Sequence, residues 1–439
     1  MQTFDWTTHP QAEALVEDLL TQALAASPAL RDLAERLATE TSTRLADWLD
    51  HVCAPADLDA LRAAGFTTAG GTGDVWRHPS AQLPAVVPSS SFSLAIRVED
   101  AAAFAGVHGG APVEGAPMSG LRRAVVTEPG APVLLAGVER RSWACGVAPH
   151  VLADHEVVAA VRSWALWAER PRAYDVANGL DEARSRAAEM VALVGADLAA
   201  SYAMEIERRF WQRRNNAAVV QHARQDRLGL GWGNHDHHTF RSSRGAFRSL
   251  IEVLQLLGFA LRERFYAGEE AGWGAQVLEH AGAGLVVFAD VDLEPAEVDV
   301  DFAQAELAAA PRLGTVGLWC ALHGESLLAA GMHHLEGQFD FDRLRADLSA
   351  RGIEHMAPFS DFPHLRQAFT AAERWPVARG RLDALVASGQ LEPEQAQDFA
   401  ARGAAGSHLE NLARRGGFKG FNQHNVSATM RATDPRVLR

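Results

Sequence analysis

Apolar residues follow two different spacings along the chain, and the changes between them divide it into parts. Between residues 9 and 50 they recur at helical spacing, as in AEALVEDLLTQAL. Between residues 70 and 150, Gly, Pro and Ser interrupt short alternating runs such as FSLAIRV and PVLLAGV, which predict strands. Helical spacing returns over 153–226. We therefore predict N-terminal helices with a sheet module over 1–150, a helical connector over 151–226 and a further domain over 227–439.

Strand and helix patterns alternate from residue 235 onward. HDHHTFR predicts a strand, GAFRSLIEVLQLLGF a helix that ends at a glycine, and AGLVVFADVDL a buried strand. TVGLWCALHG and AGMHHLEGQF predict further strands or strand ends, and DFDRLRADLSARGI predicts another helix that ends at a glycine. The polar, Gly-rich segment GGFKGFNQHNVSATMRATDPR predicts an irregular tail packed on this domain.

A histidine, a helix and a Gly-apolar step recur in that order. His237 precedes a helix that leads to Gly258–Phe259, and His334 precedes one that leads to Gly352–Ile353. A fainter copy begins at His51. Repeats of one supersecondary unit predict units that share a core. We therefore predict an α+β fold in which βαβββ units form a curled mixed sheet around a metal cleft, with flanking helices.

The two histidines at equivalent positions of paired repeats point to a metal site. His237 and His334 would face one cleft, and two imidazoles with one carboxylate form the facial triad of non-haem Fe(II) enzymes. Such a triad leaves positions open for a chelating substrate and O₂. Glu373 in FTAAERWPV is the candidate carboxylate, and Glu354 and Glu410 are the alternatives.

Strand alternation sorts the polar neighbours of His237. On an extended strand His235 and Arg241 share its face, whereas His238 points to the opposite face. His235, His238 and His333 stay open as replacements for a predicted ligand. Arg241 would lie about 13 Å along the strand. There it could hold the distal carboxylate of a short diacid through a bidentate fork, the alternative being a structural salt bridge.

Composition removes several classes of function. The formal net charge is −14, which argues against a general nucleic-acid-binding surface. Cys53, Cys145 and Cys320 are widely spaced and form neither a disulfide framework nor a CxxC zinc motif. No run of about 18 apolar residues predicts a membrane span. Since the N-terminus lacks a signal-peptide pattern, we expect a cytoplasmic protein with no membrane partner.

Four short motifs within about residues 230–439 carry a resemblance to a known family. DHHTFR before a helix and LLGF is similar to a DHIAFR-type motif, and MHHLEGQFDFD resembles an Asn-His-Leu-Thr stretch followed by an acidic pair. AERW…ARGRLDAL is similar to a Glu-bearing segment ahead of Lys-Gly-Arg, and NVSATM resembles a C-terminal Val-Ser-Ala. These are motifs of the 2-oxoadipate dioxygenase/decarboxylase (hydroxyglutarate synthase) family. His333 replaces its Asn, and Glu336 replaces its Thr.

This resemblance implies a vicinal-oxygen-chelate-like fold, Fe(II) as the cofactor and O₂ as co-substrate. The implied site residues are His237, His334 and Glu373 as metal ligands, Arg241 as the catalytic arginine that binds the substrate carboxylate, and Ser427 as a further substrate contact.

The expected function is a mononuclear non-haem Fe(II) oxygenase that acts on a small 2-oxo acid, with oxidative decarboxylation and hydroxylation. One alternative is another vicinal-oxygen-chelate metalloenzyme, such as a ring-cleaving dioxygenase, an isomerase or a lyase. The other is a metal-free module that binds a small molecule. In the N-terminal half, we expect His51 and Glu139 to have structural roles. A catechol-type substrate would need aromatic walls, for which the candidates are Trp232, Phe240, Trp273 and Trp375.

Overall fold

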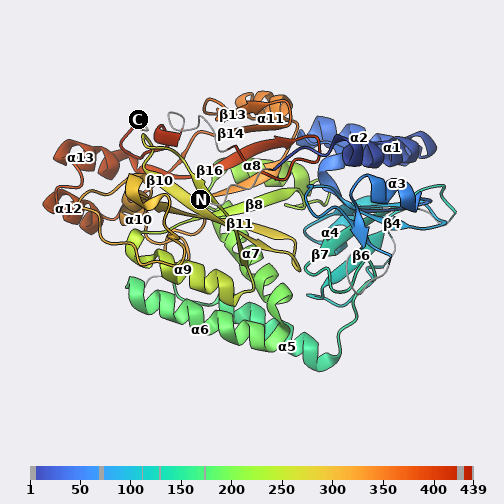
Figure 1. Cartoon of the computed structure of the whole chain (residues 1–439), viewed down its shortest axis with the longest axis horizontal. Helices are drawn as coiled ribbons and strands as arrows, with labels where there is room; N and C mark the ends of the chain where they lie inside the picture. The colour runs from blue at the N-terminus through green and yellow to red at the C-terminus, as the bar shows by residue number, and fades with distance from the viewer. Residues whose placement is uncertain are drawn as a thin grey trace.

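Two β-sheets with packed helices make up the computed structural model of the chain (Figure 1). The structure describes residues 6–68, 74–110, 112–127, 130–172, 175–422 and 430–437. Ser427, which was expected to contact the substrate, lies outside the described residues. No helix in the described part of the chain is long and apolar enough to cross a membrane.

The N-terminal half builds the first sheet, which has seven strands within the described residues. Their order is β2-β3-β4-β1-β5-β7-β6. The strands are β1 (Leu49–Ala54), β2 (Thr67–Thr68), β3 (Trp76–Arg77), β4 (Ala85–Pro88), β5 (Ser93–Arg97), β6 (Leu121–Val125) and β7 (Leu134–Arg140). The helices of this half are α1 (Pro10–Ala26), α2 (Pro28–Arg36), α3 (Leu58–Ala63) and α4 (Ala101–His108).

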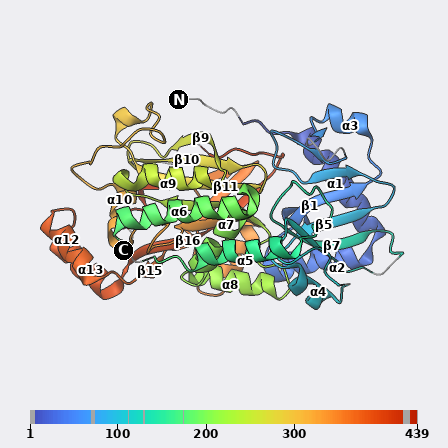
Figure 2. The same cartoon turned by 90° about the horizontal axis from the view of Figure 1, so that it is seen from below.

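A group of helices connects the two sheets. They are α5 (Asp154–Ala168), α6 (Val176–Val194), α7 (Ala196–Gln212) and α8 (Asn216–Asp226). Helix α6 runs beside α9 (Arg244–Leu256) beneath the second sheet (Figure 2). Apolar side chains of α6, α7 and α9 form one core with those of the sheet face that they cover.

The second sheet has nine strands within the described residues, and β8 and β12 pair at its centre. Its order is β13-β14-β16-β12-β8-β11-β10-β9, and β15 pairs with β16. The strands are β8 (His235–Arg241), β9 (Ala260–Tyr266), β10 (Trp273–His280), β11 (Leu285–Asp292), β12 (His334–Gln338), β13 (Ser360–Phe362), β14 (Leu365–Phe369), β15 (Glu373–Trp375) and β16 (Ala404–Arg414). The remaining helices are α10 (Thr315–His323), α11 (Phe341–Ser349), α12 (Arg379–Ala387) and α13 (Pro393–Arg402).

Each sheet is built from two related supersecondary units, and one unit of the first sheet is a strand shorter than the others. In the second sheet the units are β8-α9-β9-β10-β11 and β12-α11-β13-β14-β16, and they join through antiparallel β8 and β12. In the first sheet β1-α3-β2-β3-β4 and β5-α4-β6-β7 join through antiparallel β1 and β5. Both sheets mix parallel and antiparallel pairs. The predicted fold class, α+β with βαβββ units in a curled mixed sheet, is confirmed.

One predicted strand is wrong. The segment TVGLWCALHG forms helix α10, not a strand. Its residues from Thr315 through Cys320 are all buried, and so is Leu322. A short run that is apolar all round carries no helical period, so its pattern cannot be told from that of a buried strand. The helix packs over the second sheet, on the face opposite α9.

Candidate metal centre

Strand pairing gathers five polar side chains on one face of the second sheet. Across antiparallel β8 and β12, His237 pairs with Glu336 and Thr239 pairs with His334. Directly paired residues point to the same face of a sheet, so both histidines face the same way. Parallel pairing of β12 with β16 then places Glu410 next to Glu336. This register therefore places His237 and His334 on the same face, close to the same glutamates.

These groups converge within contact distance. Nε2 of His237 lies 2.8 Å and Nε2 of His334 lies 2.5 Å from Oε1 of Glu336. Nε2 of His334 is also 3.6 Å from Oε2 of Glu410. Candidate ligand atoms of His237, Glu336 and Glu410 all lie within 4.8 Å of one another. The four side chains are buried, so bulk water does not compete for them.

A buried ion pair orients the first histidine. Oδ1 of Asp236 lies 3.0 Å from Nδ1 of His237 and accepts a hydrogen bond from its N–H, which leaves the lone pair on Nε2, toward the cluster. Arg414 binds both oxygens of Asp236, at 3.0 and 3.1 Å. Burial lowers the pKa of His237 to about 4, against the opposing effect of Asp236, so the imidazole is neutral. A neutral, oriented imidazole is the form that binds a metal.

The two carboxyl groups hold protons that a cation would displace. Burial and the neighbouring Glu410 raise the pKa of Glu336 well above its ordinary value, and burial raises the pKa of Glu410 to about 7. Oε2 of Glu336 is buried without a hydrogen-bond partner among the described residues. Two imidazoles and two carboxyl groups with raised pKa values thus meet in one buried cluster. A divalent ion would neutralise both carboxylates, and this nitrogen and oxygen donor set suits a first-row transition metal.

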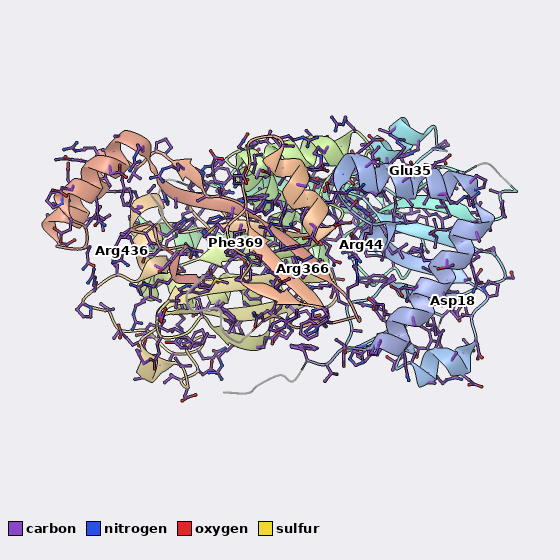
Figure 3. The ribbon with its side chains drawn as sticks, turned by 90° about the horizontal axis from the view of Figure 1, so that it is seen from above. Asp18, Glu35, Arg44, Arg366, Phe369 and Arg436 are labelled. Atoms are coloured by element: carbon purple, nitrogen blue, oxygen red, sulfur yellow. The ribbon has the colours of Figure 1, made fainter. Side chains whose placement is uncertain are left out.

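A small aromatic cavity of about 50 Å³ adjoins the cluster. Since one water needs about 10–15 Å³ on this measure, the cavity holds a few water-sized groups as it stands, and a larger ligand requires its aromatic walls to move apart. Figure 3 shows Phe369, one of its walls, near the middle of the molecule. The aromatic residues that line it are Phe265, Trp273, Phe288, Phe359, Phe369 and Phe421.

Glu373, the expected carboxylate ligand, lies outside this group. Its Oε2 accepts a hydrogen bond from the backbone N–H of Asn216 at 3.0 Å, at the start of α8. It pairs across β15 and β16 with Ser407, nearer the start of β16 than Glu410 is. Glu410, which the sequence left open as an alternative, is the carboxylate that the structure brings to both histidines, together with Glu336.

Arg241 shares the face of His237 but is held behind the cavity. It is 2% exposed, and its Nε lies 3.7 Å from Oδ2 of Asp290. Its guanidinium carbon lies 5.7 Å from the centre of the Trp319 ring. Asp290 lines the cavity and Arg241 does not. In this arrangement the arginine can position Asp290, and its guanidinium does not line the space that a substrate would occupy.

The other histidines that the sequence left as possible ligands lie outside the cluster. His235 packs against His238, with ring centroids 5.2 Å apart. The expectation that His235 shares the face of His237 is wrong, because the register between β8 and β12 shifts at Gly337. His333 lies behind its neighbour, and its Nδ1 is 2.6 Å from the Nδ1 of His334.

A sequence signal for the two glutamates was present. The tripeptide His-Leu-Glu occurs at His334–Glu336 and again at His408–Glu410. The two copies pair in register, histidine with histidine and glutamate with glutamate. Alternation puts the histidine and glutamate of each copy on the same face of a strand. The repeat therefore marks two strands that place both glutamates on the face of His334.

We expect the thermal stabilisation given by a divalent ion to increase from about pH 5.5 to about pH 8, because binding must displace the proton of a carboxyl group. The pKa of Glu410 is raised to about 7, whereas His237 is already neutral over this range. Protons released on binding make the complex more favourable as pH rises. Melting temperatures with and without Zn²⁺ at each pH test this. A stabilisation that is constant or larger at low pH contradicts it.

Comparisons with known proteins leave the family open. No family model and no curated protein matches the sequence. Methylmalonyl-CoA epimerase from Mycobacterium tuberculosis is 13% identical over 42% of this chain and 89% of that one, with a TM-score of 0.25. A mutant 4-hydroxymandelate synthase from Streptomyces coelicolor is 14% identical over 89% of this chain and 99% of that one, with a TM-score of 0.31.

A third solved structure has a similarly low score. An uncharacterized Shigella flexneri protein that includes domain DUF1338 is 14% identical over 59% of this chain and 84% of that one, with a TM-score of 0.25. At these identities and TM-scores, the matches decide neither the family nor the activity of this chain.

Proposed function

We propose that this chain is a mononuclear non-haem Fe(II) oxygenase whose substrate is a small 2-oxo acid and whose co-substrate is O₂. His237, His334 and Glu410 would hold the ion. The observation that carries the proposal is the convergence of two buried imidazoles, one of them oriented by Asp236, and two buried carboxyl groups beside an aromatic cavity. Two histidines and a carboxylate are the ligands of the Fe(II) facial triad, which leaves room for a chelating substrate.

The cavity walls favour a 2-oxo acid with an apolar or aryl side chain. Six aromatic residues line it, and no Arg or Lys does so among the residues that the structure describes. A second carboxylate on the substrate would lack a cationic partner there, and a buried unpaired charge is costly. The expected contact between Arg241 and a diacid therefore gives way to a positioning role, in which the guanidinium holds Asp290.

The protein residues have separable tasks in this proposal. Bound Fe(II) would supply the electron chemistry with O₂ that oxidative decarboxylation and hydroxylation require. Asp236 fixes the tautomer of His237. Phe288 and Phe421, whose rings lie 4.6 and 5.0 Å from that of His237, keep water from the metal face of the cavity.

Oxygen consumption tests the proposal. The protein is purified under anaerobic conditions, loaded with Fe(II), and given O₂ with a panel of 2-oxo acids that carry aryl, branched apolar or carboxylate side chains. We expect uptake that depends on both the metal and the substrate, and faster uptake with the aryl and branched acids than with the diacids. The absence of substrate-dependent uptake with every 2-oxo acid would overturn the proposal.

Glu336 favours a second candidate, a metal-dependent isomerase or lyase. Its carboxyl group is buried, has a raised pKa and contacts both histidines. A group of this kind can move a proton at the carbon beside a carbonyl that the metal polarises. Such chemistry needs no O₂ and would also proceed with Zn²⁺ or Ni²⁺.

Glu336→Gln separates the two candidates. We expect this variant to bind the metal and to retain most of its O₂ uptake, because the proposed oxygenase needs no proton transfer from Glu336. If Glu336 is a general acid or base, turnover should instead fall by about 10²- to 10⁴-fold with metal content unchanged. Metal analysis and rates measured with Fe²⁺, Zn²⁺ and Ni²⁺ on the same preparation decide between them.

A further inference from the structure

The first sheet contains a second oriented histidine. Nδ1 of His51 lies 2.8 Å from Oδ2 of Asp50, so the carboxylate accepts a hydrogen bond from Nδ1–H and leaves Nε2 as the basic atom. Arg140 binds both oxygens of Asp50, each at 2.7 Å. The metal-centre histidine is oriented by the same kinds of partner, an aspartate before it and an arginine at the end of a later strand. Thus each sheet contains a histidine that is oriented by an aspartate and an arginine.

The surrounding positions differ between the two sheets. Strands β1 and β5 pair as β8 and β12 do, and Cys53 pairs with Ser93, where the second sheet pairs Thr239 with His334. His51 pairs with Ala95 at the position of the His237 and Glu336 pair.

Strand β7 completes the comparison. It lies parallel to β5, as β16 does to β12, and it places Ala136 opposite Ala95. Glu410 and Glu336 occupy these two positions in the second sheet. The first sheet therefore keeps the oriented histidine, lacks both carboxylates and the second imidazole, and carries a thiol instead. Among the described residues, only the second sheet holds a cluster with enough ligands for a metal ion.

Cys53 is placed to be activated by His51. The two residues alternate on β1 and share one face of the sheet. Burial opposes ionisation of the thiol, but the hydrogen bond with His51 and the charge of that ring lower the pKa of Cys53, with Ser93 and Arg123 adding to the effect. The pKa of His51 is raised against burial by Asp50 and Cys53. The thiol is half-buried, so a small reagent can reach it.

We propose that Cys53 is a nucleophilic thiol that reacts with small disulfides, with His51 as its base and Asp50 as the group that orients this base. Nε2 of His51 takes the thiol proton, and the Cys53 sulfur attacks one sulfur of the disulfide. The S–S bond breaks and a mixed disulfide forms on Cys53. The second sulfur leaves as a thiolate and takes the proton back from His51, so the exchange needs no other oxidant.

The chain provides its own reference thiols. Cys145 is also half-buried, but burial raises its pKa, and its sulfur lies 3.4 Å from the backbone oxygen of Ser142. Cys320 is buried, and burial raises its pKa well above the ordinary value. Similar exposure with opposite electrostatic environments makes Cys145 the matched comparison for Cys53.

The test is the rate at which glutathione disulfide modifies each cysteine of the full chain, measured by peptide mass mapping. We expect Cys53 to react about tenfold faster than Cys145 at about pH 7, since the thiolate is the reactive form. His51→Gln should lower the rate at Cys53 by about tenfold and leave Cys145 unchanged. Equal rates at Cys53 and Cys145, or a Cys53 rate that His51→Gln does not change, would overturn the proposal.

A measurement on the unmodified protein covers the case in which His51→Gln does not fold. The rate at Cys53 should reach half of its maximum at least about one pH unit below that at Cys145. The same midpoint for both thiols would overturn the proposal. Cys53→Ser should leave O₂ uptake unchanged, so this test is independent of the function of the metal centre. The charged groups around the pair that bear on its pH profile are Asp50, Arg97, Arg123 and Arg140.

Discussion

Glu410→Gln is expected to abolish metal-dependent turnover, whereas Glu373→Gln should leave it unchanged. Glu410 is 2% exposed and its Oε2 lies 3.6 Å from Nε2 of His334. Glutamine keeps the volume and removes the anionic ligand. We expect metal affinity to fall by more than about 100-fold, beyond the 10- to 100-fold that follows loss of an outer-shell partner.

Glu373→Gln is the matched control for this prediction, because it makes the same chemical change on β15, the strand that pairs with the start of β16. Its Oε2 meets a backbone N–H of Asn216, a contact that a glutamine carbonyl can keep. Metal content after dialysis and substrate-dependent O₂ uptake are measured on both variants. If Glu373→Gln loses the metal and Glu410→Gln retains it, the ligand role returns to Glu373.

Asp236→Asn is expected to damage both stability and metal binding. The carboxylate is buried between His237 and Arg414, and these two partners hold its pKa well below the ordinary value although burial opposes ionisation. Removing one charge leaves the guanidinium of Arg414 buried without a counter-ion, which typically costs about 3–5 kcal/mol of the free energy of unfolding. Weaker orientation of His237 should lower metal affinity by about 10- to 100-fold.

Asp50→Asn separates these two effects. Asp50 is buried against Arg140 and His51 in the same geometry, but it lies in the first sheet. We expect a similar loss of stability, about 3–5 kcal/mol, with the metal affinity of the second sheet unchanged. Urea unfolding of the metal-free proteins and metal titration give the two quantities. Unchanged metal affinity in Asp236→Asn would show that His237 does not depend on its aspartate or is not a ligand.

Local pattern accounts for the parts of the site that were predicted. The alternation in HDHHTFR indicates a strand, and in the structure strand β8 spans His235–Arg241. The repeat of histidine, helix and glycine step identifies His237 and His334 as equivalent, and they meet across β8 and β12. Both inferences use residues that are close in sequence, where side-chain direction follows from the backbone period.

Pairing between strands that are distant in sequence accounts for the parts of the site that were not predicted. Glu373 and Glu410 both follow His334, and nothing local decides which one returns to it. The choice is made by the parallel ladder of β16 with β12, which puts Glu410 beside Glu336 and leaves Glu373 at Asn216. The shift at Gly337 that turns His235 away is likewise a property of the paired strands.

By itself, then, the sequence determined the α+β class, the repeated unit and the two histidines, because each is encoded in the period of a single segment or in its recurrence. Only the tertiary structure decided the carboxylate partners, the position of Arg241 behind Asp290 and the helical form of α10. It also showed that each sheet holds a histidine oriented by an aspartate, and that the residues around this histidine differ between the two sheets. The physical reason is that ligand sets and buried ion pairs form between strands distant in sequence, where register selects the neighbours.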